Sequence, residues 1–118
     1  LKVAMDAATA RDRNVVKVVT DGRGRALYFS RLPIPCDRDG DGTARHYKHI
    51  GLYAYTREAL DLFHRLPRSP LELAEKLEQL RYLENGIGIR VMETPHDTIG
   101  VDTAEDLEKA AALLVPET

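Results

Sequence analysis

Two side chains that can form hydrogen bonds lie on one face of a predicted strand. Residues 47–55 alternate between polar and apolar types, which is typical of a half-buried strand. The alternation gives a polar face and an apolar face that should enter the core: His49, Gly51, Tyr53 and Tyr55 on the first, and Ile50, Leu52 and Ala54 on the second. An imidazole and a phenol could bind the hydroxyl groups of a ligand, with Gly51 leaving room for a close approach. A solvent-facing strand predicts the same pattern, so both explanations remain open.

Asp102 stands where an α/β fold could bind a metal ion. It lies between an extended segment and the start of the last predicted helix at Thr103. Ligands of α/β folds bind beyond the carboxyl ends of strands. A carboxylate at this junction could hold Mg²⁺ against a phosphate or could stabilise the helix end, and the sequence favours neither.

Three further polar residues have simpler explanations on spacing alone. Glu78 and Gln79 lie off the apolar stripe of their predicted helix, as expected of a solvated face. Arg31 could bind a carboxylate with both arms of its guanidinium, although an arginine near a strand end is usually a surface charge. Residues 37–42 have the acidic spacing of a calcium loop, but Lys48 stands where the bidentate glutamate is required. That segment is interpreted as a solvated loop.

The elements that must position these residues alternate between strands and helices. Strands are predicted at residues 1–5, 14–20, 25–30, 47–55 and 87–93, and helices at 57–66, 70–84 and 103–114. Residues 6–13 form a connector or one loose helical turn, 31–35 an extended proline-containing arm and 36–45 a polar loop. The helix at 57–66 should face the core with Leu60, Phe63 and Leu66, and the helix at 70–84 with Leu73, Leu77 and Leu80. This order predicts an α/β fold whose sheet is at least partly parallel.

Composition narrows the classes of function. The 118 residues contain 17 Lys and Arg against 19 Asp and Glu, giving a formal net charge of -2. This balance argues against a nucleic-acid or anionic-membrane partner, and no stretch approaches the ~18 apolar residues of a membrane span. The single cysteine, Cys36, excludes an internal disulfide and favours a reducing, cytoplasmic location. The chain starts at Leu1 without a signal segment, which leads us to expect a piece of a longer protein.

Five segments in order resemble one enzyme family along nearly the whole chain. They are NVVKVVTD, ALYFSRLPIP, YKHIGLYAYTREAL, SPLE followed by LEQLRYLENG, and IGVDTAEDLEKA. The chain resembles the carboxyl-terminal half of the 3-deoxy-manno-octulosonate cytidylyltransferases, the CMP-Kdo synthetases of lipopolysaccharide biosynthesis. The resemblance implies a partial Rossmann-like nucleotidyltransferase fold: a mixed sheet with flanking helices, a β-hairpin and an extended arm.

The resemblance also implies a reaction and roles for single residues. The family joins CTP to the sugar acid Kdo with Mg²⁺, releasing pyrophosphate. Arg31 would hold the Kdo carboxylate, and Asp102 would be one of two aspartates that hold Mg²⁺. The sugar hydroxyls would be bound by the remaining candidates, His49, Tyr53, Glu78 and Gln79.

The nucleotide-binding half of the family has no counterpart in this sequence. The amino-terminal A-R-x-x-S-x-R-L-P-x-K type loop and the other metal aspartate are missing. Residues 1–118 are therefore expected to be the sugar-acid-binding and dimerisation half, inactive alone, and a homodimer or associated with the missing half. Two alternatives remain: a non-enzymatic binding or assembly module that reuses the fold, and a cytidylyltransferase for another sugar acid such as sialic acid.

Overall fold

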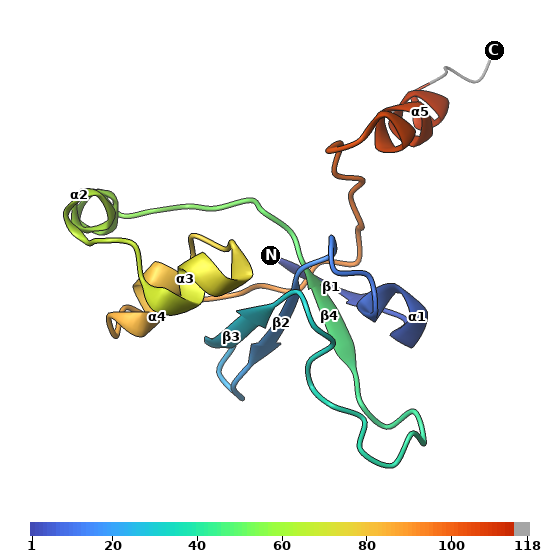
Figure 1. The fold of residues 1–118 in the computed structure, drawn as a ribbon, viewed down its shortest axis with the longest axis horizontal. Coiled ribbons are helices and arrows are strands. Elements are labelled where there is room, and N and C mark those ends of the chain that lie inside the picture. Colours follow the sequence, from blue (N-terminus) through green and yellow to red (C-terminus); the bar gives the residue numbers. More distant parts are fainter. Residues whose placement is uncertain (115–118) are drawn as a thin grey trace.

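A computed structural model describes residues 1–114 and contains one four-stranded sheet (Figure 1). The strand order is β1-β4-β2-β3, and every pair of these strands is antiparallel. The strands are β1 (Lys2–Met5), β2 (Lys17–Thr20), β3 (Ala26–Ser30) and β4 (His46–His49). The predicted parallel component is confined to an isolated bridge between Lys2 and Glu93. The predicted α/β fold with flanking helices is confirmed, and its four strands form an antiparallel sheet.

The predicted hairpin is β2–β3, although β2 begins at Lys17 rather than at residue 14. The Asp21 carboxylate accepts hydrogen bonds from the backbone N–H groups of Arg23 (2.8 Å) and Arg25 (2.9 Å). Gly24 has a φ of +81°, and a Cβ there would lie 3.3 Å from the Val91 carbonyl oxygen. Glycine therefore permits both the left-handed turn and the close approach of the segment that carries Val91.

The strand predicted at residues 87–93 is an extended segment that makes only isolated bridges. It bonds β3, through Ala26 N–H to the Ile89 carbonyl (2.8 Å), and then β1, through Lys2 N–H to the Met92 carbonyl (2.8 Å). Its bridge to Arg25 is antiparallel, whereas its bridge to Lys2 is parallel. The segment thus crosses from one edge strand of the sheet to the other, too briefly on each to form a ladder.

The strand predicted at residues 47–55 ends at His49, so this prediction was wrong in length. The register of β1 against β4 stops at the pair Lys2–His49. Immediately afterwards Leu52 N–H bonds the Ile50 carbonyl (2.8 Å), a tight local turn that ends the extended run. Ile50 is buried as predicted, but Leu52 is 67% exposed and Ala54 is also exposed.

The helices are α1 (Ala7–Ala10), α2 (Arg57–Arg65), α3 (Pro70–Glu75), α4 (Leu80–Glu84) and α5 (Ala104–Leu113). The single helix predicted at residues 70–84 is broken, because Lys76 adopts the left-handed conformation (φ 57°) and ends α3. The break interrupts the predicted apolar stripe of Leu73, Leu77 and Leu80. Leu77 and Leu80 enter the core, whereas Leu73 stays 45% exposed.

The core lies between the sheet, the α3–α4 segment and the 87–93 segment. Its buried cluster consists of Val18, Ala26, Phe29, Leu77, Leu80 and Val91. Helix α2 contributes no buried residue, so the prediction that Leu60, Phe63 and Leu66 face the core was wrong. Figure 1 shows α2 at the far end of a long connection from β4, beside α3 and α4 rather than on the sheet.

Helix α5 begins where predicted, with the Thr103 hydroxyl accepting a hydrogen bond from Asp106 N–H (3.1 Å). It stands away from the sheet in Figure 1, and none of its residues is buried. The connection before it is anchored by Lys48, whose Nζ bonds Asp97 Oδ1 (2.8 Å) and the Thr98 carbonyl (2.6 Å). Among residues 1–114, no helix has the length and apolar character needed to cross a membrane.

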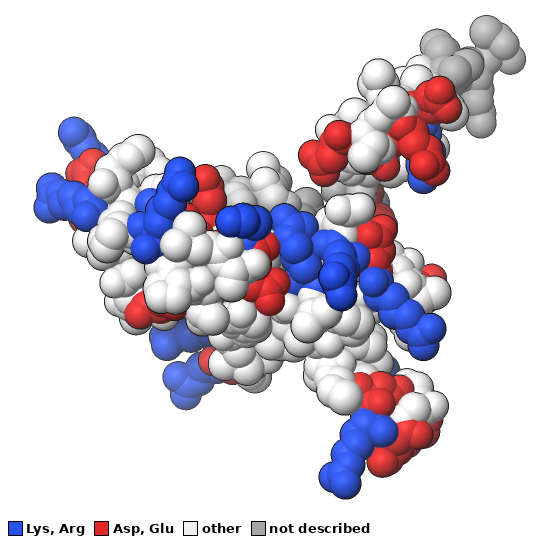
Figure 2. All heavy atoms as spheres, in the orientation of Figure 1, with Lys and Arg blue, Asp and Glu red and all other residues white. Residues whose placement is uncertain are grey.

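Acidic side chains gather at two places on the face drawn in Figure 2, on α5 and on the loop at residues 36–45. Within that loop the Asp37 carboxylate accepts from Gly42 N–H (2.9 Å) and that of Asp41 from Thr43 N–H (3.0 Å). These two carboxylates stabilise turns within the loop. In the described part of the chain, no group of three or more His, Cys, Asp or Glu side chains is placed to hold a metal ion.

Candidate functional site

A row of aromatic rings connects the sheet with the helices. Neighbouring ring centroids are 4.9 to 6.0 Å apart, within the range of favourable aromatic pairs. In order from β3 to α2, the aromatic row consists of Phe29, His49, Tyr53, Tyr55, Tyr82 and Phe63. The row therefore brings side chains from four separate elements into one continuous surface.

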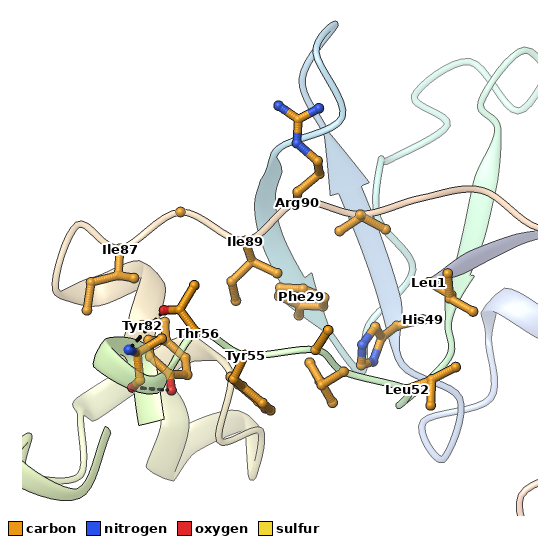
Figure 3. A pocket seen from close by; sticks show the side chains of 15 residues that line it. Leu1, Phe29, His49, Leu52, Tyr55, Thr56, Tyr82, Ile87, Ile89 and Arg90 are labelled. Atoms are coloured by element: carbon orange, nitrogen blue, oxygen red, sulfur yellow. Dashed lines mark hydrogen bonds between the residues drawn. The ribbon is translucent and has the colours of Figure 1, made fainter. Parts of the chain in front are cut away.

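The first cavity, of about 310 Å³, lies along this row (Figure 3). Phe29 and His49 line it from the sheet side, and Thr56 and Tyr82 from the helix side, as Figure 3 shows. The segment carrying Ile89 forms a further wall. The lining is mostly apolar and aromatic with a few polar groups, the usual character of a small-molecule site.

The second cavity, of about 470 Å³, adjoins the first. Tyr53, Tyr55 and Tyr82 line both cavities. Glu78 and Gln79 line the second from the turn between α3 and α4. Four of the residues singled out in the sequence are thus brought together: His49 in the first cavity, Glu78 and Gln79 in the second, and Tyr53 in both.

Burial fixes the protonation of the two residues from the predicted strand face. Burial and, to a smaller extent, the positive charge of the Leu1 amino group together lower the pKa of His49 to about 4. The imidazole is therefore neutral near pH 7 and carries one donor and one acceptor nitrogen. Burial raises the pKa of Tyr53, so its phenol remains a hydrogen-bond donor. Both side chains can bind hydroxyl groups without bringing charge into the cavity.

Arg31 lines neither cavity. Its guanidinium donates to three backbone carbonyls, those of Glu75 (2.8 Å), Arg13 (3.2 Å) and Lys76 (3.4 Å). These bonds use three of the five N–H donors of a guanidinium and leave two for another acceptor. One of these partners, Lys76, lines the second cavity, so Arg31 contacts the wall of that cavity without lining it.

Asp102 is not brought near the other candidates. It is exposed, lines neither cavity, and precedes α5, with its backbone N–H bonding the Asp106 carboxylate (3.3 Å). Mg²⁺ commonly takes one or two protein carboxylates together with phosphate oxygens and water. An exposed aspartate fits one ligand of such a set but does not form a site by itself.

Sequence reasoning missed two residues that shape the cavities. Tyr82 lines both, and its hydroxyl bonds the Ala59 carbonyl of α2 at 2.7 Å. Its position three and four residues after Gln79 and Glu78 was a usable signal, since such neighbours share one side of a helix. Arg81 pairs with Glu72, nine residues earlier, a separation that no continuous helix would bring face to face.

Comparisons with known proteins assign the chain to a class and then to a family. One similar solved structure is entitled the structure of CMP:2-keto-3-deoxy-manno-octonic acid synthetase complexed with CTP. The match covers 96% of the present chain and 46% of the synthetase chain, at 48% sequence identity and a TM-score of 0.89. The fold is therefore that of a nucleotidyltransferase. A family model described as cytidylyltransferase matches residues 2–99. The chain belongs to this cytidylyltransferase family.

Curated relatives carry a more specific name. The 3-deoxy-manno-octulosonate cytidylyltransferase of Koribacter versatilis is 53% identical over 114 residues, which cover 97% of this chain and 44% of the relative. The enzyme of the same name from Solibacter usitatus is 57% identical over 102 residues, covering 86% of this chain and 40% of the relative. The chain thus spans less than half the length of the relatives it matches.

Proposed function

We propose that this chain is the carboxyl-terminal, sugar-acid-binding half of a 3-deoxy-manno-octulosonate cytidylyltransferase. The enzyme would transfer CMP from CTP to Kdo and release pyrophosphate. The observation that carries the proposal is the pair of adjoining cavities, which gathers His49, Tyr53, Glu78 and Gln79 from separate elements. The names of the curated relatives and of the solved synthetase support the choice of substrates.

The side chains of the cavities would bind and orient the sugar acid. The neutral imidazole of His49 and the phenol of Tyr53 would form hydrogen bonds with its hydroxyls. The carboxylate of Glu78 would accept hydrogen bonds from them, and the amide of Gln79 would both donate and accept. Arg31, whose three bonds to backbone carbonyls leave two N–H donors, would hold the sugar carboxylate. A hydroxyl oriented in this way attacks the α-phosphorus of CTP, and the bond to pyrophosphate breaks as the new O–P bond forms. Alignment supplies much of the rate.

Mg²⁺, when bound, would neutralise charge on the CTP phosphates. We propose Asp102 as one of its carboxylate ligands, supported by the exposed position of this side chain next to the N-terminus of α5. The other carboxylate and the phosphate-binding loop would come from the nucleotide-binding half of the enzyme.

We further propose that the chain pairs with a second copy or with the nucleotide-binding half. Large apolar side chains are strongly exposed, among them Leu52, Met92 and Leu107. Partner surfaces commonly cover exposed apolar side chains of this size. The use of CTP and the lone Cys36 favour the cytoplasm.

Titration calorimetry of the chain with Kdo tests the proposal. His49→Phe keeps a ring against Phe29 but removes the hydrogen bonds, so Kd should rise about tenfold, or ~1.4 kcal/mol. His96→Phe is the matched control, because His96 is exposed and lines neither cavity. Binding of sialic acid in preference to Kdo would transfer the proposal to that substrate, and binding of neither would favour a non-enzymatic module.

Activity assays test the division of labour between the halves. The chain alone should release no pyrophosphate from CTP and Kdo, and turnover by it would contradict the proposed missing half. In the enzyme completed by its nucleotide-binding half, Asp102→Ala should lose activity that Mg²⁺ supports. Wild-type Mg²⁺-dependent activity of that variant would remove Asp102 from the metal site.

A further inference from the structure

Two residues of α4 tie α2 to the rest of the molecule. The Tyr82 hydroxyl donates to the Ala59 carbonyl (2.7 Å), and Arg81 Nη1 donates to the Phe63 carbonyl (3.2 Å). The Arg81 guanidinium also lies over the Phe63 ring, 3.9 Å from its centroid. Because α2 has no fully buried residue, these directional contacts, together with the Phe63–Tyr82 ring pair, set its position.

Arg81 is itself held by a carboxylate on α3. Its Nε donates to Glu72 Oε2 (2.8 Å) and its Nη2 to Glu72 Oε1 (2.5 Å), so both arms of the carboxylate are engaged. Both residues are buried, and Glu72 also accepts from Ser69 N–H (3.0 Å) at the start of α3. A two-armed pair of this kind fixes orientation as well as distance. The Arg81 guanidinium therefore joins three helices at one point.

This junction frames the second cavity. The pair spans the turn after Lys76, which carries Glu78 and Gln79 into the cavity. Phe63, clamped beneath the guanidinium, and Tyr82, the next residue along α4, line the same cavity. Arg81 lines neither cavity, so it acts through the residues that do.

We propose that Arg81, oriented by Glu72, is a positioning residue that sets the affinity of the second cavity for the sugar acid by holding α2 against α4. The inference rests on the proposed function. A buried ion pair is a poor source of net stability, because desolvation offsets its attraction and apolar replacements often match it. What apolar residues cannot reproduce is three charged donors directed at two helices. That directional role is the one the geometry assigns to Arg81.

Hydrogen exchange and Kdo binding by the full chain test the proposal together. Arg81→Lys keeps the charge opposite Glu72 but loses the planar fork, and Arg81→Met removes both. We expect faster exchange of the α2 amides in both variants and a Kd for Kdo raised about tenfold in Arg81→Lys and further in Arg81→Met. Exchange in β2 and β3 should match that of the wild type, which separates displacement of α2 from general unfolding.

Glu84→Gln is the matched control. Glu84 accepts from Leu71 N–H (3.2 Å) and so also links α4 to α3, but it makes no bond to α2. It should leave α2 exchange and Kd unchanged. Wild-type protection of α2 in Arg81→Lys and Arg81→Met would overturn the positioning role, and loosened α2 with unchanged Kd would overturn its link to the cavity. A wild-type chain that does not bind Kdo would refute the proposed function instead, while the exchange data still decide whether Arg81 holds α2.

Discussion

Helix α5 has strong local helix signals but no buried residue, whereas helix α4 has weak local signals but three buried residues. Helix α5 has ten residues, a capping box at Thr103 and a Glu105–Lys109 ion pair of 2.8 Å. Helix α4 has five residues and no side-chain cap, yet Leu80, Arg81 and Tyr82 are all buried. Isolated helices shorter than ~12–15 residues are marginal in water even with good sequences. Packing therefore holds α4, whereas α5 depends on its own turns.

The same contrast separates the candidate residues. Glu78 and Gln79 precede α4, and their place in the second cavity follows from the packing of Leu77 and Leu80 in the core. Asp102 precedes α5, whose only described supports are local. A residue positioned by a packed element has a fixed geometry, whereas Asp102 would acquire its geometry when α5 meets another surface.

The largest difference should appear when one leucine is truncated in each helix. Leu80 is completely buried, so Leu80→Ala should lower the free energy of unfolding by about 4 kcal/mol through lost burial and a cavity. Leu107 is 59% exposed, so Leu107→Ala should change it by less than ~0.5 kcal/mol. Urea unfolding monitored by fluorescence measures both. Comparable losses in the two variants would mean that α5 packs against the core or a second chain in solution.

An acid titration should distinguish the packed part of the molecule, which contains His49, from the connection towards α5. Burial lowers the pKa of His49 to about 4 in the folded chain, against 6.5 when exposed. Between these values the unfolded chain binds a proton that the folded chain does not, so stability falls as the pH drops from 6.5 to 4 and then levels off. Allowing for partial exposure, the loss attributable to His49 is about 2 kcal/mol.

Unfolding curves at pH 7 and pH 4.5 test this loss with two variants. His49→Phe should flatten the dependence on pH by that amount. His96→Phe should not, because His96 is exposed on the connection towards α5. An unchanged slope in His49→Phe would show that its imidazole is solvated rather than buried.

Local sequence signals predicted the ends of several elements correctly. The N-terminal caps at Thr56, Ser69 and Thr103 all begin helices, and the Asp21–Gly24 turn joins a hairpin. These features depend on neighbours within four residues, which a sequence displays directly.

Features that depend on distant contacts were predicted poorly. The break at Lys76 interrupts a segment with good helical periodicity, because Leu77 and Leu80 reach the core only after the chain turns. The strand predicted at 47–55 stops early because the chain turns: Ile50 N–H still bonds the Leu1 carbonyl (2.9 Å), but Leu52 N–H then bonds back to the Ile50 carbonyl (2.8 Å). Neither the core nor the partner strand can be read from the local pattern.

Part of the candidate site was predicted from the sequence, through the family resemblance rather than through local signals. Spacing alone made Glu78 and Gln79 a solvated face, and only the family resemblance marked them as candidates. The structure brings them to a cavity but leaves the bonding to sugar a proposal. Tyr82 and Arg81 escaped both routes, since their roles arise from contacts with α2, more than 15 residues away.

The smallest expected effect, removal of one cap, tests the independence of α5 most directly. Thr103→Ala removes the hydroxyl that bonds Asp106 N–H, at a cost of about 1 kcal/mol to helix formation. Because no packing offsets that loss, carbon chemical shifts of residues 104–113 should move towards random-coil values while the urea midpoint of the sheet stays constant. Thr56→Ala makes the same change in α2, where Thr56 caps Ala59 N–H (3.1 Å). Since Arg81 and Tyr82 also hold α2, its shifts should move less. A lowered urea midpoint in Thr103→Ala would show that α5 unfolds together with the sheet and that its position, and that of Asp102, is set by packing after all.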